Sequence, residues 1–212
     1  GGNFNLKKNE PMDDNKHGTH TSGTIGAVGN NGKGTAGVAW NVTILPIKFL
    51  SAQGSGSLAD AVESIKYATK MGAHIMSNSW GGGGFSQTMF DAIKAARDKN
   101  ILFIAAAGNE SNNNDAKTTY PAGYKLENVM AVAATDNKDV MASFSNYGKT
   151  TVHLAAPGVN VYSTVPGNKY ATFSGTSMAC PHVAGAAAVL WSLNKDFTFA
   201  QIKERLIKTA TP

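Results

Sequence analysis

Short apolar segments alternate with stretches of helical period along the chain, and this order limits the fold more than any other feature. The segments 44–50 and 101–107 are apolar runs bounded by polar or glycine-rich residues, as expected of strands buried on both faces of a parallel sheet. Further strands are expected at 74–80, 129–135 and 152–155, and helices at 57–72, 86–99, 176–193 and 200–209. The alternation predicts an α/β fold of three layers, with a mainly parallel central sheet and helices on both faces.

The composition indicates one globular domain. Hydrophobic residues make up 42% of the 212 residues and charged residues 16%, and a chain of this length normally forms a single domain. No apolar run approaches the ~18 residues that a membrane-spanning helix needs. The net charge is +5, but the lysines are scattered, which gives nucleic-acid binding little support. The single cysteine, Cys180, excludes an intrachain disulfide, and its small apolar neighbours favour a buried, inert thiol.

Four polar residues lie at positions where they could take part in catalysis or ligand binding. Asn109 follows the apolar segment 101–107, at the edge of the sheet where ligands bind. Ser177 opens a long apolar helix, whose free N–H groups and dipole would stabilise a negative oxygen beside it. His17 and His20 lie three residues apart at an expected helix start. Taken singly, each residue also fits a helix cap, a turn or a local hydrogen bond, and no Cys or Glu pair is spaced to complete a zinc site with the histidines.

The chain contains four distinctive motifs: His17-Gly-Thr-His20, Ser77-Asn-Ser-Trp-Gly-Gly82, Ala106-Ala-Gly-Asn-Glu110 and Gly175-Thr-Ser-Met-Ala-Cys-Pro-His-Val-Ala-Gly185. These motifs resemble those of the subtilisin family of serine proteases. The motifs occur in the family's order, and the similarity covers nearly the whole chain. The resemblance implies a subtilisin-like fold, with residues 1–212 as part of a peptidase domain. It also implies a serine endopeptidase that acts on proteins or peptides through an acyl-serine intermediate.

The resemblance implies a role for each matching residue. Ser177 would be the nucleophile and His17 its general base, which later protonates the leaving amine. Asn109 and the backbone N–H of Ser177 would form the oxyanion hole. His20 would be structural.

The same resemblance implies where the substrate lies. A substrate strand would pair with the backbone of Ser79, Trp80 and Gly81 along the cleft. The walls of the main specificity pocket would be Ala106, Ala107 and Gly108. Because no charge is placed there, we expect a broad preference for large or apolar side chains before the cut.

The family's third catalytic residue, an aspartate in an apolar-Asp-Thr/Ser-Gly context, has no counterpart in this sequence. Asp13 and Asp14 resemble the loop that leads into the catalytic histidine, so we expect them to be surface residues. Besides protein or peptide substrates, the expected partners are a propeptide or a separate N-terminal chain that supplies the aspartate. Without that carboxylate the chain alone would be weak or inactive, because His17 loses the group that orients it.

The glycine-rich loop 29–37 has two interpretations. Gly32, Gly34 and Gly37 match the G-x-G-x-x-G dinucleotide pattern, but here a helix precedes the loop and a strand follows it, the reverse of what such a site needs. The loop also resembles one that holds a structural calcium ion in many subtilisins. In that case Asn31 would be a side-chain ligand, and backbone carbonyl groups would supply others.

Two other functions are possible for such a chain. One is a subtilisin-shaped module that binds peptides without cleaving them, and the other is a nucleotide-binding α/β domain, which the context of the glycine loop contradicts. The expected localisation is outside the cell, because the resemblance to this family implies a secreted protein. Intracellular relatives exist, however, and one cysteine does not decide between the two.

Overall fold

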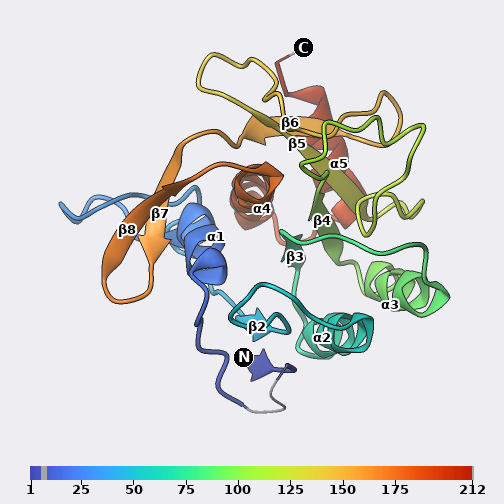
Figure 1. The fold of residues 1–212 in the computed structure, drawn as a ribbon, viewed down its shortest axis with the longest axis horizontal. Coiled ribbons are helices and arrows are strands. Elements are labelled where there is room, and N and C mark those ends of the chain that lie inside the picture. Colours follow the sequence, from blue (N-terminus) through green and yellow to red (C-terminus); the bar gives the residue numbers. More distant parts are fainter. Residues whose placement is uncertain (6–8, 212) are drawn as a thin grey trace.

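The computed structural model describes residues 1–5 and 9–211. Its centre is a parallel sheet of four strands in the order β3–β4–β5–β6 (Figure 1). The strands are β3 (Ile75–Asn78), β4 (Leu102–Ala106), β5 (Val129–Thr135) and β6 (Leu154–Pro157). Both inner strands are buried along their whole length, as the apolar runs in the sequence predict.

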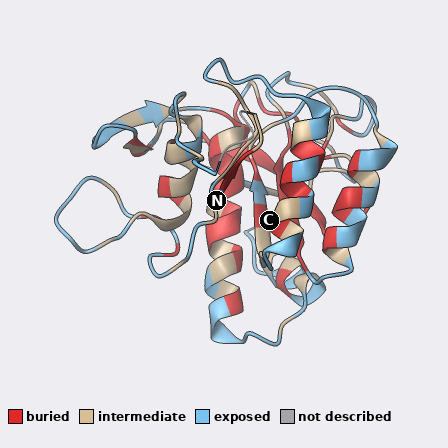
Figure 2. Ribbon diagram, turned by 90° about the horizontal axis from the view of Figure 1, so that it is seen from below, coloured by how far each residue is buried: buried red, intermediate tan, exposed pale blue. Residues whose placement is uncertain are grey.

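Helices cover both faces of this sheet, so the three-layer α/β prediction is confirmed. On one face lie α2 (Leu58–Lys70) and α3 (Gln87–Arg97), and on the other α4 (Thr176–Leu193) and α5 (Phe199–Lys208). Figure 2 shows the buried residues of the helices on the sides that face the sheet. Successive residues of β4 pack on opposite faces of the sheet. Phe103 belongs to the core under α2 and α3, and Ile104 to the core under α4 and α5.

A further helix, α1 (His17–Gly26), packs along α4 beside a hairpin of two antiparallel strands (Figure 1). The hairpin strands are β7 (Val161–Val165) and β8 (Lys169–Phe173). No strands were expected at these residues. The sequence does carry a hairpin signal, the pair Gly167-Asn168. In the structure both residues have positive φ angles, of 83° and 55°.

The strand expected at 44–50 is mostly irregular, which corrects the prediction. Only β2 (Ile47–Lys48) pairs, with β1 (Gly2–Asn3), in a separate parallel sheet of two strands. An extended apolar run becomes a strand only where a neighbour completes its hydrogen bonds, and Pro46 has no N–H to offer. In the part of the chain that is described, β3 likewise pairs on one edge only, with β4.

The helix boundaries follow the capping signals in the sequence. The Ser57 hydroxyl accepts a hydrogen bond from the Asp60 N–H (3.0 Å) at the start of α2, and Gly72 follows its end with a φ of 72°. Asn100 has a φ of 61° after α3, as expected of a residue that closes a helix. None of the described helices is both long and apolar enough to cross a membrane.

Candidate active site

Ser177 is the second residue of α4 and is tied to the carboxyl end of β3 by two hydrogen bonds. Its hydroxyl donates to the carbonyl oxygen of Ser79 (3.3 Å), and the Ser79 hydroxyl donates to the carbonyl oxygen of Ser177 (2.8 Å). Ser177 is half-buried. A nucleophile candidate therefore stands at a helix N-terminus and at the edge of the sheet where α/β proteins bind ligands.

The side-chain amide of Asn109 reaches the same helix start. Its Oδ1 accepts hydrogen bonds from the backbone N–H (2.8 Å) and the hydroxyl (2.9 Å) of Thr176. Since a backbone N–H can only donate, the amide atom that faces Thr176 is the oxygen, and Nδ2 points the other way. Both amide atoms of Asn109 and the backbone nitrogen of Ser177 lie 3.7 Å from the point that a Cβ on Gly175 would occupy. Nδ2 donates to no partner within residues 1–5 and 9–211. The site thus holds an unused N–H donor next to Ser177.

Thr176 links Asn109 to the start of α4, and the sequence did not single it out. It is fully buried, and its hydroxyl also accepts a hydrogen bond from the Gly108 N–H (3.2 Å). Thr176 stands beside Ser177 in the sequence, but only the folded structure shows that its hydroxyl meets the loop after β4. No sequence signal distinguishes it from an ordinary threonine at a helix start.

His17 is the first residue of α1, the helix that packs along α4 (Figure 1). Its ring makes no hydrogen bond to any described residue, and Ser177 is bonded to Ser79 instead. Burial lowers the pKa of His17, a nearby His20 lowers it further, and the charge of Asp13 opposes both. The neutral ring is consequently favoured at pH 7.

His20, one turn later in α1, has the environment of a structural residue. Its side chain is fully buried, and Nε2 lies 3.1 Å from the carbonyl oxygens of both Val161 and Ala171. The ring also stacks on Phe173 at 4.4 Å between centroids. His20 therefore links α1 to the β7–β8 hairpin, which fits the structural role that the resemblance implied for it.

The sequence model of the subtilase family matches residues 2–212. The chain belongs to the subtilase family. It is 45% identical over 201 residues to a thermophilic serine proteinase of Bacillus sp. (strain AK1), an alignment that covers 95% of this chain and 48% of that protein. It is 43% identical over 200 residues to subtilisin Savinase of Lederbergia lenta, covering 94% of this chain and 72% of the relative.

Structural comparison agrees with the sequence comparison. The crystal structure of a cold adapted subtilisin-like serine proteinase superposes with a TM-score of 0.88 at 34% identity, over 99% of this chain and 73% of that one. The fold predicted from the resemblance is thus confirmed. The chain spans about half the length of several curated subtilases that it matches.

Asp13 differs from the surface residue that the sequence predicted. Its half-buried carboxylate accepts four hydrogen bonds, from the N–H groups of Asn15, Lys16 and Thr19 and from the Thr19 hydroxyl, at 2.6 to 2.9 Å. Burial raises the pKa of Asp13, but these bonds outweigh burial and lower it overall. Asp13 is occupied with the start of α1 and bonds to no ring nitrogen of His17. Asp14 is exposed, as predicted, and pairs with Lys48 (2.6 Å).

The two segments expected to bind substrate lie at the carboxyl ends of β3 and β4. After β3, the backbone runs through Ser79 and Trp80 into Gly81, and the next N–H, of Gly82, donates to the Tyr120 carbonyl (3.0 Å). The Trp80 ring itself packs edge-on against Phe49, at 5.0 Å between centroids. Its indole is therefore half-buried and packs against the core under α2.

After β4, the chain continues through Ala106, Ala107 and Gly108 to Asn109. Ala106 and Ala107 are buried, with exposed fractions of 8% and 0%, and Gly108 is half-buried. These small residues bring the backbone close to the start of α4, where the Gly108 N–H meets Thr176. This segment thus places Asn109 beside Ser177.

The loop that contains Asn31 offers few donor atoms of the kind that calcium binds. Residues 29–36 enclose a hollow of about 320 Å³. However, the Asn31 Oδ1 accepts a hydrogen bond from the Lys33 N–H (2.9 Å), and the loop contains a lysine but no carboxylate. Calcium prefers six to eight oxygens, usually including carboxylates. The loop alone does not fit the ion, and nowhere in residues 1–5 and 9–211 do three or more His, Cys, Asp or Glu side chains converge as for a metal.

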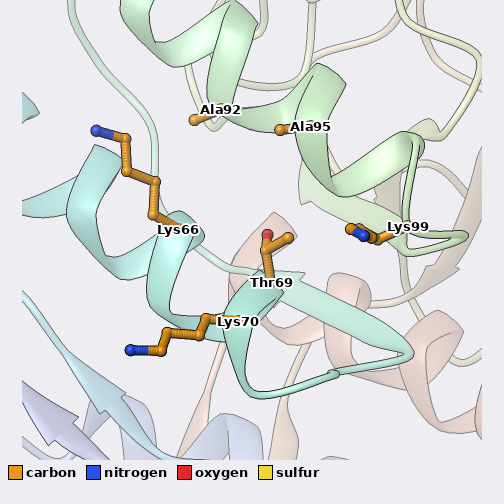
Figure 3. A pocket seen from close by; sticks show the side chains of 6 residues that line it. All are labelled: Lys66, Thr69, Lys70, Ala92, Ala95 and Lys99. Atoms are coloured by element: carbon orange, nitrogen blue, oxygen red, sulfur yellow. The ribbon is translucent and has the colours of Figure 1, made fainter.

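A second hollow, of about 430 Å³, lies between α2 and α3 (Figure 3). Its lining residues are Lys66, Thr69, Lys70, Ala92, Ala95 and Lys99. In Figure 3 the amino groups of Lys66 and Lys70 point away from the hollow, and Lys66 pairs with Glu63 (2.8 Å). The hollow contains no predicted site residue and no nucleophile with an adjacent base.

Proposed function

We propose that the protein is a serine endopeptidase that hydrolyses peptide bonds in proteins through an acyl-serine intermediate. One observation carries the proposal: Thr176 holds the Asn109 oxygen, so that the Asn109 Nδ2 is presented at the start of the helix that carries Ser177. A donor fixed there by the fold needs no rearrangement when negative charge develops on the substrate oxygen. Membership of the subtilase family supports the same assignment.

In the proposed reaction, the Ser177 Oγ attacks the carbonyl carbon of the scissile bond while His17 takes the hydroxyl proton. The Asn109 Nδ2 and the Ser177 N–H donate hydrogen bonds to the resulting oxyanion. His17 then gives its proton to the leaving amine, the C–N bond breaks, and a water molecule activated by the same ring releases the acid from Ser177. Burial favours the neutral form of His17, which is the form that a general base needs.

The mechanism has two further requirements, a rotation of the Ser177 side chain and a carboxylate that orients His17. The Ser177 hydroxyl must turn from the Ser79 carbonyl towards His17, a side-chain rotation that substrate binding would favour. We also propose that a carboxylate from a polypeptide segment outside residues 1–212, or from a separate chain, orients His17. The open edge of β3 and the short β2 support this proposal, because a further strand would complete the hydrogen bonds of both. Loss of such a carboxylate lowers kcat about 10⁴-fold in serine proteases with this triad.

For the substrate, we propose an extended peptide that pairs with the backbone after β3, with a large or apolar side chain before the cut. The small, uncharged residues Ala106, Ala107 and Gly108 support this preference, because they supply neither a charge nor a large side chain that would select a particular residue. The preference would be broad, since most of the recognition falls on the backbone.

The test uses the complete protein that contains this chain. We expect a fluorophosphonate probe to label Ser177 and the protein to hydrolyse casein, and both activities to disappear in the Ser177→Ala variant. If the folded complete protein binds a casein-derived peptide but neither labels nor cleaves, the alternative function holds and the chain is a peptide-binding module. Circular dichroism of both variants establishes that they are folded.

We also propose that the protein binds a structural calcium ion. A structural calcium ion at Asn31 would need carboxylates from elsewhere in the protein. If the complete protein supplies them, we expect calcium to raise its Tm and Asn31→Ala to abolish that rise.

We further propose that the protein is secreted, which rests on the family resemblance. Protease activity confined to the cells of the source organism, with none in the medium, would contradict secretion.

A further inference from the structure

Asn146 is a buried asparagine in the segment between β5 and β6, far in sequence from every residue assigned above. Its side chain is fully buried. A buried amide must find its hydrogen-bond partners within the protein. For Asn146 the loop that follows β4 and carries Asn109 supplies them.

The Asn146 side chain bonds to the loop on both sides of Asn109. Its Nδ2 donates to the Ala107 carbonyl (3.1 Å) and to the Glu110 carboxylate (2.7 Å), and its Oδ1 accepts from the Glu110 N–H (2.9 Å). Its backbone N–H donates to the Gly108 carbonyl (2.9 Å). The residues immediately before and after Asn109 are therefore both held by one amino acid.

The same side chain secures the rest of the loop. The Asn146 Oδ1 also accepts from the Asn112 N–H (3.0 Å), and its Nδ2 lies 3.2 Å from the Oδ1 of Asn114, itself buried. Gly108 makes room for this contact: it has a φ of 115°, and a Cβ there would lie only 2.2 Å from the Asn146 Nδ2. The unusual backbone at Gly108 and the buried amide thus fit one another.

Asn109 itself has few contacts that could fix its position. Asn109 is exposed, and among the described residues its side chain forms hydrogen bonds only with Thr176. The direction in which the Asn109 Nδ2 points therefore depends on the backbone at 108 and 110. An oxyanion donor that is misplaced by about 1 Å loses much of its effect on the rate.

We propose that Asn146 is a positioning residue for catalysis: by holding Ala107, Gly108 and Glu110, it fixes the Asn109 amide where the oxyanion forms. This inference rests on the proposed function. It predicts that Asn146 acts on the transition state through Asn109, without touching the substrate.

The experiment is a double-mutant cycle in the complete protein, with kcat and KM measured on a peptide substrate. We expect Asn146→Ala to lower kcat ~10- to 100-fold and to leave KM within about twofold. Asn109→Ala should lower kcat ~10²- to 10³-fold. In the Asn109→Ala background, Asn146→Ala should cost less than about threefold more, because the amide that it positions is already gone.

Asn128→Ala is the matched control. Asn128 is also fully buried, and its Nδ2 donates to the carbonyl oxygens of Ile93 (3.3 Å) and Ile101 (3.0 Å), at the opposite end of β4. We expect this variant to lower the Tm, as a lost buried hydrogen-bond network does, and to keep its kcat per titrated active site. If Asn146→Ala does not fold, Asn146→Ser replaces it in the cycle, because the smaller hydroxyl leaves space for a water molecule.

Two outcomes would overturn the inference. One is a loss of kcat in the double variant equal to the product of the two single losses, and the other is an equal loss of kcat in Asn128→Ala. Either result would make Asn146 a stability residue only. An inactive wild-type protein would instead refute the proposed function, and with it this inference.

Discussion

The residue directly before His17 has an unusual backbone. Lys16 has a φ of 105°, a region that L-residues rarely adopt and that glycine enters freely. The conformation persists because the Lys16 N–H donates to Asp13 (2.9 Å) and its carbonyl accepts from the His20 N–H (3.0 Å). The surrounding hydrogen bonds thus hold a strained residue at the start of α1.

Lys16→Gly should therefore stabilise the protein. We expect the free energy of unfolding to rise by about 1 kcal/mol, the relieved strain outweighing the greater freedom of glycine in the unfolded chain. Urea unfolding measures the change. Lys16→Ala is the control, since it removes the charge and keeps the Cβ, and an equal gain in both variants would show that charge and not backbone strain is responsible.

At this scale the sequence predicts those site residues whose roles lie in a motif. Ser177 and Asn109 are recognisable because each stands in a motif that resembles one of the subtilisin family, and the structure brings both to the start of α4. Thr176 and Asn146 could not be predicted. Their effect comes from hydrogen bonds to a loop more than thirty residues away in the sequence.

Among the elements, the packing of α1 and its following loop on α4 determines how the helix of His17 lies beside that of Ser177. A Cβ on Gly185, in α4, would lie 2.6 Å from the Cβ of Val38 in the loop after α1. Val38 is fixed there by its N–H, which donates to the Thr24 carbonyl (3.1 Å). The two elements approach this closely because residue 185 has no side chain.

Gly185→Ala should lower the free energy of unfolding by about 1–3 kcal/mol, although alanine is the better helix former, because the added methyl group overlaps Val38. We expect Val38→Gly to recover most of this loss in the double variant while costing little by itself, since Val38 is partly exposed. Denaturant unfolding of the four proteins gives the comparison. Equal losses with and without Val38→Gly would contradict the packing argument.

The elements also show why helices were predicted better than strands. The ends of α2 and α3 are determined by local groups, such as the Ser57 hydroxyl and the Asn100 backbone, which the sequence displays. A strand requires a partner, and the apolar segment 44–50 finds one for only two residues. Hydrophobicity indicates that a segment is to be buried, but not which strand will pair with it.

For the whole molecule, the pH dependence of stability should reflect two half-buried bases near the start of β5. His153 accepts a hydrogen bond from the Ala131 N–H on Nδ1 (3.0 Å), and Lys203 of α5 donates to the carbonyl oxygens of Glu127 and Val129. Burial, followed by the charge of Lys203, lowers the pKa of His153 from 6.5 to about 4. Burial also lowers the pKa of Lys203 from 10.5 to about 8, against the opposing charge of Glu127.

Both shifts mean that the unfolded chain binds more protons than the folded protein, so each contributes stability that rises with pH. The contribution of His153 rises between pH 4 and 6.5, and that of Lys203 between pH 8 and 10.5. We expect each to amount to about 1–2 kcal/mol after solvent screening. Urea unfolding against pH should show the first rise disappear in His153→Gln and the second in Lys203→Met. Parallel curves for the wild type and a variant would show that the residue titrates alike in both states.

The buried thiol one turn beyond Ser177 offers a way to observe motion at the start of α4. Cys180 has no exposed surface, lies 3.7 Å from the Ser77 hydroxyl, and is the sole cysteine of the chain. An alkylating reagent can reach its sulfur only while α4 is lifted from the ends of β3 and β4. The rate of alkylation under native conditions therefore reports how often this interior opens, without any label being introduced.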